Sequence, residues 1–238
     1  MRELPLPKPS EPPPLLAIFD HDGVLVDSLV FHQLAWLELG RRTGLPLTEE
    51  FILETFGMTN PAIFRRLMGD AITEADIVRF GDLKEECYRD VARGKVVLMD
   101  GVADLIEALH ARGVALAIGT SGPRANLLLT IESCGLDGRF AAIAALEDIS
   151  RSKPDPEVFL LAAEKAGVDP AGAVVFEDAP IGIQAAKAAG MLAVGVTSTR
   201  PAEALREAGA DEVVDTLAGY CVDALIDRLR RRKEGAAR

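Results

Sequence analysis

Five short, continuous apolar runs are spaced along the chain, and most of the intervening residues have helical patterns. The runs are LLAIF (15–19), VALAIG (114–119), FAAIAA (140–145), AVVF (173–176) and LAVGV (192–196). Apolar runs without polar alternation are typical of strands that are buried on both faces of a parallel sheet. We therefore expect a core of five parallel strands.

Segments with apolar residues at helical spacing follow several of these runs. They are GVADLIEALHARG (101–113), DPEVFLLAAEKAG (155–167), PIGIQAAKAAG (180–190) and PAEALREAGA (201–210). The first three end in glycine, which is a typical C-cap because it adopts the left-handed backbone conformation at little cost. Strands that alternate with helices imply right-handed crossovers. The pattern thus predicts an α/β fold with a doubly wound, Rossmann-like parallel sheet.

Residues 29–94 interrupt this alternation, because they hold helical patterns and no run typical of a buried strand. Thr48, Asn60 and Thr73 precede three of these patterns and are the expected N-caps. We expect an all-helical cap domain, residues 29–94, inserted into a core of residues 15–28 and 95–238. Residues 1–14 hold six prolines and predict an extended leader.

The composition of the chain limits the kinds of molecule that it is expected to bind. The 238 residues are 49% hydrophobic, which suffices for a buried core. A net charge of −11 disfavours binding to nucleic acids and anionic membranes, whose phosphates would be repelled. No apolar run approaches the roughly 20 residues of a membrane span, and the three dispersed cysteines do not indicate a disulfide framework. We expect a cytoplasmic protein with neither nucleic acid nor membrane as partner.

Polar side chains follow four of the predicted strands. They are Asp20 and Asp22 after the first strand, Thr120 and Ser121 after the second, Lys153 beyond the third, and Glu177 and Asp178 after the fourth. In an open parallel sheet, ligands bind beyond the carboxyl ends of the strands. We therefore expect these side chains to meet in one site.

The side chains at this edge favour phosphoryl chemistry. Four crowded carboxylates raise one another's pKa unless a cation joins them, and hard oxygen donors without His or Cys favour Mg²⁺. Lys153 and the Thr120 hydroxyl can bind phosphate oxygens. Asp20 and Asp22 point to the same side of an extended segment and can flank one phosphorus atom. The pattern predicts phosphoryl transfer with an aspartate as nucleophile.

Four segments, DHDGVLVDS, GTSGPR, SKPDPE and FEDAPIGIQAAKAAGM, resemble the four motifs of the haloacid dehalogenase (HAD) superfamily in their order and spacing. The helices inserted after the first strand resemble the cap of its β-phosphoglucomutase-like subgroup. The likeness covers nearly the whole chain after the leader. It implies a hydrolase with a helical cap.

The resemblance implies a role for each catalytic residue. Asp20 is the nucleophile that forms an aspartyl-phosphate. Asp22 is the general acid for the leaving oxygen and then the base for the attacking water. Thr120 hydrogen-bonds to the transferring phosphoryl group, and Lys153 neutralises charge between the phosphate and Asp20.

The resemblance also implies a metal site and a substrate site. The implied Mg²⁺ ligands are Asp20, Asp22 through its backbone carbonyl, Glu177 and Asp178. The candidate substrate-binding residues are Ser28, His32, Asn60, Ser121 and Lys84. Three alternatives stay open. Ser28 is also a candidate N-cap, His32 also fits a satisfied surface or interface position, and Lys84 also fits a solvated helix face. Trp36 is expected to pack in the core of the cap.

The chain departs from the family pattern at several positions. His21 is expected to pack or hydrogen-bond rather than to act in catalysis. Gly122 and Ala179 stand where relatives often have hydroxyls. In the loop where mutases offer a lysine and an arginine to a second phosphate, this chain has Phe56 and Asn60. An amide does not replace a bidentate arginine, so binding of a second phosphate is disfavoured.

We therefore expect a Mg²⁺-dependent phosphatase that acts on a small phosphorylated metabolite, a sugar or polyol phosphate, as a monomer or weak homodimer. The first alternative is a β-phosphoglucomutase-type phosphotransferase. A haloacid dehalogenase is disfavoured by Asp22, Glu177 and Asp178. A receiver-like signalling domain is disfavoured by the long helical insertion.

Overall fold

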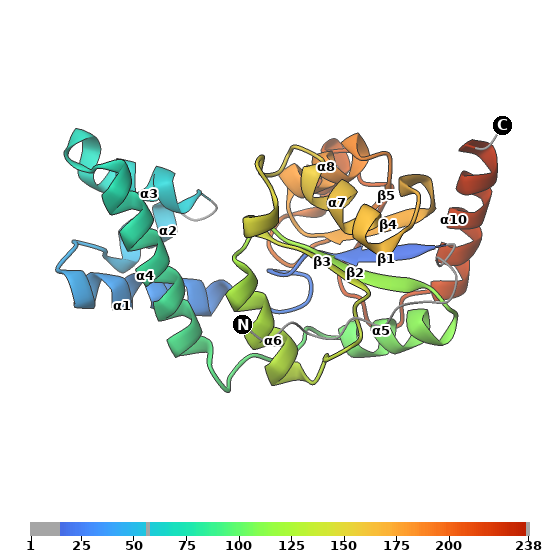
Figure 1. Ribbon diagram of the computed structural model, residues 1–238, viewed down its shortest axis with the longest axis horizontal. Coiled ribbons are helices and arrows are strands. Elements are labelled where there is room, and N and C mark those ends of the chain that lie inside the picture. The colour runs from blue at the N-terminus through green and yellow to red at the C-terminus, as the bar shows by residue number, and fades with distance from the viewer. Residues whose placement is uncertain (1–14, 56–57, 237–238) are drawn as a thin grey trace. The chain divides into compact units, whose positions relative to one another are not determined.

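The computed structural model describes residues 15–55 and 58–236 (Figure 1). The predicted leader, residues 1–14, and Phe56 lie outside the described residues. The chain forms two compact units. The first holds the described residues up to Asp27 and those from Val97 onward, and the second holds Ser28–Val96. Among the residues that the structure describes, no helix has the length and apolar content that a membrane span requires.

The first unit is built on a six-stranded parallel sheet with the strand order β3-β2-β1-β4-β5-β6. The strands are β1 (Leu16–Phe19), β2 (Ala115–Gly119), β3 (Ala142–Ala144), β4 (Ala173–Glu177), β5 (Leu192–Val196) and β6 (Glu212–Val214). β1 is central and pairs with both β2 and β4, so Phe19 lies beside Ile118 on one side and Phe176 on the other. The predicted doubly wound parallel sheet is confirmed.

The sixth strand corrects the expectation of five. β6 pairs in parallel with β5 at the edge of the sheet. It has three residues, all of them half-buried, and it begins with Glu212. An edge strand this short needs no continuous apolar run, because one of its sides is unpaired and its faces are only partly covered.

Helices cover both faces of this sheet, and Figure 1 shows α7 and α8 on one side and α5 on the other. The helices of this unit are α5 (Val102–Ala111), α6 (Arg124–Cys134), α7 (Glu157–Ala166), α8 (Pro180–Ala188), α9 (Ala202–Glu207) and α10 (Val222–Ala236). Three 3₁₀ turns, η1 (Gly69–Ala71), η2 (Leu146–Asp148) and η3 (Pro170–Gly172), occur in the described chain. The alanine-rich faces of α7 and α8 belong to the buried core that packs on the strands.

The second unit consists of helices α1 (Leu29–Thr43), α2 (Glu49–Glu54), α3 (Asn60–Met68) and α4 (Glu74–Ala92), with η1 between the last two. Thr48 and Thr73 cap α2 and α4 with their side chains, as predicted. The prediction for Asn60 is wrong, because Thr59 is the N-cap and Asn60 is the first helical residue. The Asn60 amide instead donates to Glu85 Oε1 at 2.9 Å, which gives it a partner outside its own helix.

Apolar and aromatic side chains join these helices. Trp36 of α1 is buried, and its ring lies edge-on to that of Phe64 at 5.1 Å. Phe64 in turn contacts Phe80 of α4 at 5.8 Å between ring centroids. The expectation that Trp36 packs in the core of the helical insert is confirmed.

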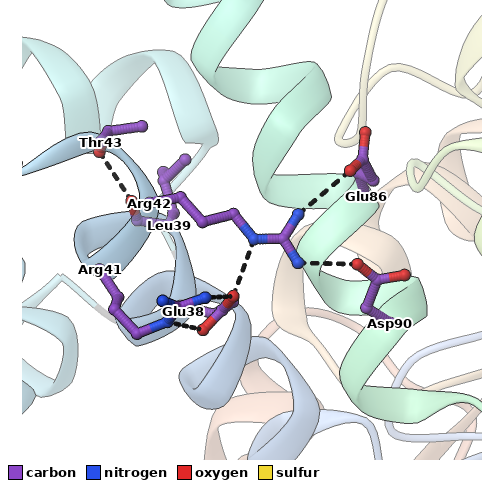
Figure 2. Close-up of polar contacts among 7 residues, drawn as sticks. All are labelled: Glu38, Leu39, Arg41, Arg42, Thr43, Glu86 and Asp90. Atoms are coloured by element: carbon purple, nitrogen blue, oxygen red, sulfur yellow. Dashed lines mark hydrogen bonds and ion pairs between the residues drawn. The ribbon is translucent and has the colours of Figure 1, made fainter.

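A cluster of charged side chains on the solvent side connects α1 with α4, as Figure 2 shows. The Arg42 guanidinium contacts Glu38 at 2.8 Å on its own helix, and it reaches Glu86 at 3.1 Å and Asp90 at 2.8 Å on α4. Arg41 forms a second, bidentate pair with Glu38. Exposed ion pairs contribute little to stability individually. This cluster therefore supplements the aromatic packing that joins α1 to α4 through Phe64 of α3.

Candidate active site

The register of the central strands brings acidic side chains to one edge of the sheet. Phe19 of β1 pairs with Phe176 of β4. Asp20 directly follows Phe19, and Glu177 directly follows Phe176. The Asp20 backbone N–H also donates to the Phe176 carbonyl at 3.0 Å, which extends the strand pairing by one bond. Asp20, Glu177 and Asp178 are all buried. Their side chains thus meet at the carboxyl ends of neighbouring strands.

Lys153 links two of these carboxylates. Its ammonium group lies 2.7 Å from Asp20 Oδ1 and 2.7 Å from Glu177 Oε1, and its side chain is only 5% exposed. Burial alone would lower the pKa of Lys153, but the charges of Asp20 and Glu177 outweigh it and raise that pKa. The lysine therefore stays protonated between the two acids.

Glu177 is held in one orientation by groups on three sides. Its Oε1 accepts from Lys153, and its Oε2 accepts from the backbone N–H groups of Asp178 at 2.6 Å and Ala179 at 2.8 Å. Gly182 in the first turns of α8 leaves the space that this carboxylate fills. A Cβ atom at Gly182 would lie 2.6 Å from Glu177 Cγ and closer still to the carboxyl group. The start of α8 is thus shaped around the Glu177 side chain.

Asp178 is held by residues that the sequence analysis did not assign. The Thr199 hydroxyl donates to Asp178 Oδ2, and a Cβ at Gly23 would lie 2.7 Å from Asp178 Cγ. Gly23 has a φ of 77°, which is unfavourable for residues with a side chain. Thr120 directly follows β2, whereas Thr199 is the third residue after β5. The residue directly after β5 is Thr197, so the sequence signal that identifies Thr120 does not identify Thr199.

The acidic cluster has the composition and spacing of a metal site. One oxygen from each of Asp20, Glu177 and Asp178 lies within 4.8 Å of the others. Burial and the neighbouring carboxylates, opposed by Lys153, raise the pKa of Asp20 to about 7. Burial and the charges of Glu177 and Asp20 raise the pKa of Asp178 to about 8. These three hard oxygen donors fit Mg²⁺, and the cluster could hold such an ion.

We expect the pH dependence of stability to reveal this site. Asp20 and Asp178 have pKa values of about 7 and about 8 in the folded protein without metal, against roughly 4 in an unfolded chain. Their contribution to stability is full below pH ~4 and is lost as pH rises through 7 to 8. In EDTA, Tm should therefore fall between pH 5 and pH 8. Millimolar Mg²⁺ should raise Tm more at pH 8 than at pH 5, as scanning calorimetry would measure.

The variant Asp178→Asn is the matched control for this experiment. It removes one titrating carboxyl, so its Tm in EDTA should vary less with pH than that of the parent. A Mg²⁺-induced rise in Tm that is equal at both pH values in the parent would contradict the assignment of the cluster as a cation site.

Asp22 lies beside a buried histidine. His21 Nδ1 is 3.1 Å from Asp22 Oδ1, and the Asp22 side chain is 38% exposed. On the other side of the ring, His21 Nε2 lies 2.8 Å from the Thr130 hydroxyl of α6. Burial would lower the pKa of His21, but the Asp22 charge outweighs it and raises that pKa. The expectation of a packing or hydrogen-bonding role for His21 is confirmed.

The loop that follows β2 lies close to Asp22. The buried Thr120 accepts from the Gly122 backbone N–H through Oγ1 at 2.9 Å. A Cβ at Gly122 would lie 3.3 Å from Thr120 Oγ1 and 3.6 Å from Asp22 Oδ2. Ser121 Oγ is buried and has no hydrogen-bond partner within the described part of the chain. The Thr120 hydroxyl therefore lies near Asp22, and the Ser121 hydroxyl belongs to the same loop.

The remaining predicted substrate-binding residues belong to the second unit. Lys84 is buried, and its ammonium lies 2.8 Å from His32 Nδ1 and 2.8 Å from Glu85 Oε1, so it does not belong to a solvated face. Asn60 donates to the same Glu85 oxygen. Ser28 is buried at the N-cap position of α1, but its side chain makes no capping hydrogen bond. The structure thus joins His32, Asn60 and Lys84 in one cluster with Glu85.

Two of the curated proteins that align with most of this chain illustrate the similarity. Validoxylamine A 7'-phosphate phosphatase of Streptomyces hygroscopicus subsp. limoneus is 36% identical over 200 residues, which are 81% of this chain and 90% of that protein. β-Phosphoglucomutase of Bacillus subtilis (strain 168) is 30% identical over 191 residues, 77% of this chain and 84% of that protein. Both names refer to phosphorylated small molecules.

The fold agrees with these alignments. The crystal structure of a HAD hydrolase, family IA, variant 3, from Entamoeba histolytica HM-1:IMSS matches with a TM-score of 0.81 at 26% identity and covers 91% of this chain and 99% of that one. The sequence pattern of the family described as haloacid dehalogenase-like hydrolase matches residues 17–196. Since the pattern includes all four motifs and the relatives align over more than two thirds of the chain, this protein is a member of the haloacid dehalogenase-like hydrolase family.

Proposed function

We propose that this chain is a Mg²⁺-dependent phosphatase that hydrolyses a small phosphorylated metabolite, a sugar or polyol phosphate, through an aspartyl-phosphate on Asp20. The observation that carries the proposal is the buried contact of Lys153 with Asp20 and Glu177, beside Asp178. A nucleophilic carboxylate, a fixed cation and further oxygen donors are the groups that phosphoryl transfer to an aspartate requires.

In the first step, the Asp20 carboxylate attacks the phosphorus atom and the ester oxygen departs. Asp22 donates a proton to that oxygen, so the leaving group is a neutral alcohol. Lys153 and the hydroxyls of Thr120 and Ser121 donate to the phosphoryl oxygens. Asp20, Glu177 and Asp178 are the residues that would hold a Mg²⁺ ion, which when bound would further neutralise the phosphate charge.

In the second step, a water molecule attacks the phosphorus atom of the aspartyl-phosphate. Asp22, now ionised, takes the proton of this water, and the Asp20 carboxylate is regenerated as inorganic phosphate forms. The same aspartate thus serves as acid and then as base. Asp22 suits this exchange because its side chain is partly exposed, whereas Asp20 is buried.

The second unit supports a substrate that carries one phosphate. We propose residues 29–94 as the cap that selects the substrate and residues 15–28 with 95–238 as the catalytic core. The charge of Lys84 is already matched by Glu85, whose pKa is lowered by Lys84 against the effect of burial. A balanced cluster with an amide and an imidazole suits sugar or polyol hydroxyls better than a second phosphate.

A β-phosphoglucomutase-type phosphotransferase is the second candidate, because the Bacillus subtilis mutase is 30% identical to this chain. It would use the same aspartyl-phosphate and differ in the group that accepts the phosphoryl. The phosphatase is favoured, since the Streptomyces phosphatase is more similar, at 36% identity.

A panel of sugar, polyol and other small phosphate esters, assayed for phosphate release with Mg²⁺ and with EDTA, tests the proposal. We expect release that depends on Mg²⁺. β-Glucose 1-phosphate separates the two candidates, because a phosphatase forms glucose and phosphate whereas a mutase forms glucose 6-phosphate. Isomer formation with little free phosphate would favour the mutase, and release that survives EDTA would count against both.

A further inference from the structure

The imidazole of His21 lies between a helix and the proposed acid/base residue. Its Nε2 is 2.8 Å from the hydroxyl of Thr130, which is fully buried in α6, and its Nδ1 is 3.1 Å from Asp22 Oδ1. Both ring nitrogens therefore have a polar neighbour. A buried ring with this arrangement is connected to the protein at two points and cannot turn without losing one of them.

The two oxygens of Asp22 have different surroundings. Oδ1 is fully buried, whereas the side chain as a whole is 38% exposed, so the accessible oxygen is Oδ2. Oδ2 also faces the loop after β2, because a Cβ at Gly122 would lie 3.6 Å from it and 3.3 Å from Thr120 Oγ1. His21 thus contacts the buried oxygen and leaves the other one beside a proposed phosphoryl-binding hydroxyl.

We propose that His21 is a positioning residue that holds Asp22 Oδ1 so that Oδ2 carries out the proton transfers, with Thr130 as the anchor of the ring. This inference rests on the proposed function, because it assigns Asp22 the acid/base role. With the proton on Nδ1, the ring presents its N–H side to Asp22 Oδ1, 3.1 Å away, and accepts from the Thr130 hydroxyl through Nε2. Orientation of an acid or base toward the reacting atom contributes to rate without any contact between His21 and the substrate.

A purely structural role for His21 makes a different prediction. If the ring only fills space, leucine should replace it at the cost of stability alone, and all substrates should be affected alike. If the ring orients Asp22, its loss should matter when the leaving oxygen needs a proton. Alkyl phosphates need that proton, whereas p-nitrophenyl phosphate does not, because nitrophenolate is a stable leaving group.

The test compares kcat/KM for these two esters in a matched set of variants, since kcat/KM includes only the steps up to departure of the leaving group. His21→Asn retains a donor at the Nδ1 position, toward Asp22. His21→Gln retains a polar group at the Nε2 position, toward Thr130. His21→Leu removes both, Thr130→Val removes the anchor with little change in volume, and Asp22→Asn removes the acid itself.

We expect His21→Leu and His21→Gln to lower kcat/KM for the alkyl phosphate roughly 10- to 100-fold but for p-nitrophenyl phosphate less than about threefold. His21→Asn should recover most of the alkyl phosphate activity. Thr130→Val should lower kcat/KM less than His21→Leu does, and again more for the alkyl phosphate than for p-nitrophenyl phosphate. Equal losses on both esters in His21→Gln, or equal activities of His21→Asn and His21→Gln on the alkyl phosphate, would overturn the positioning role.

The same assays separate this inference from the function on which it rests. If the parent releases no phosphate from either ester, the proposed function fails and the inference with it. If Asp22→Asn shows the alkyl-selective loss while His21→Leu and His21→Gln do not, the acid role of Asp22 stands and only the role of His21 is overturned. The Asn and Gln variants keep the test decisive if the leucine variant does not fold.

Discussion

Asp20→Asn is expected to lower phosphate release roughly 10⁴-fold or more, because the amide that replaces the carboxylate is neither charged nor nucleophilic. The fold should persist. Asparagine has nearly the same shape, and Lys153 keeps its contact with Glu177 at 2.7 Å. Steady-state phosphate release, with circular dichroism and Tm as tests of folding, measures the effect.

The matched control is Asp104→Asn, which makes the same chemical change at an exposed position of α5. It should leave kcat and KM unchanged. Brief incubation with ³²P-labelled substrate followed by acid quenching should label the parent and Asp104→Asn but not Asp20→Asn. Phosphate release by Asp20→Asn at the parent's rate would exclude the nucleophilic role of Asp20.

Gly182→Ala is expected to lower the stability and the activity of the protein together. The new Cβ would lie 2.6 Å from Glu177 Cγ and closer to its carboxyl group, so Glu177 or the helix must move. Displacing Glu177 breaks its bonds to Lys153 and to the backbone N–H groups of Asp178 and Ala179. Overpacking of this kind costs roughly 1–3 kcal/mol, and the buried polar groups left without partners add to it.

We therefore expect Gly182→Ala to lower Tm by several degrees and to lose most of its activity, since Lys153 would no longer be held beside Asp20 by Glu177. Gly81→Ala is the matched control, because Gly81 also lies inside a helix, α4, but has no heavy atom within 4 Å of its Cβ position. That change should stabilise the protein by about 0.5–1 kcal/mol through helix propensity and leave activity unchanged. Equal Tm shifts in the two variants would show that Glu177 tolerates the methyl group.

The central strands could be predicted from the sequence because both of their faces are buried, which makes them continuously apolar. Two elements of the first unit, one strand and one helix, have weaker apolar patterns and were not predicted. β6 is a short edge strand with partly exposed residues. α6 buries Asn126 and Thr130 together with leucines, so its buried face is not marked by apolar residues alone.

The acidic part of the candidate site was predictable from the residues at the ends of two strands. Asp20, Glu177 and Asp178 meet because β1 and β4 are neighbours, whereas Lys153 reaches Asp20 and Glu177 from the segment after β3, a strand that β2 separates from β1. The residues that hold these groups in place were not predictable in this way. Thr199 and Thr130 are ordinary threonines in the sequence, and only the folded chain brings them to Asp178 and His21.

The pairing of Phe19 with Phe176 has a consequence for how this chain can vary during evolution or redesign. Adjacent residues of a strand point to opposite faces, so loss of one residue from β1 would turn Asp20 away from Glu177. An exchange of isoleucine for valine at Ile18 would leave that geometry intact. Homologues should therefore differ in which apolar residues occupy positions 16–19, while insertions and deletions accumulate in segments outside the strands.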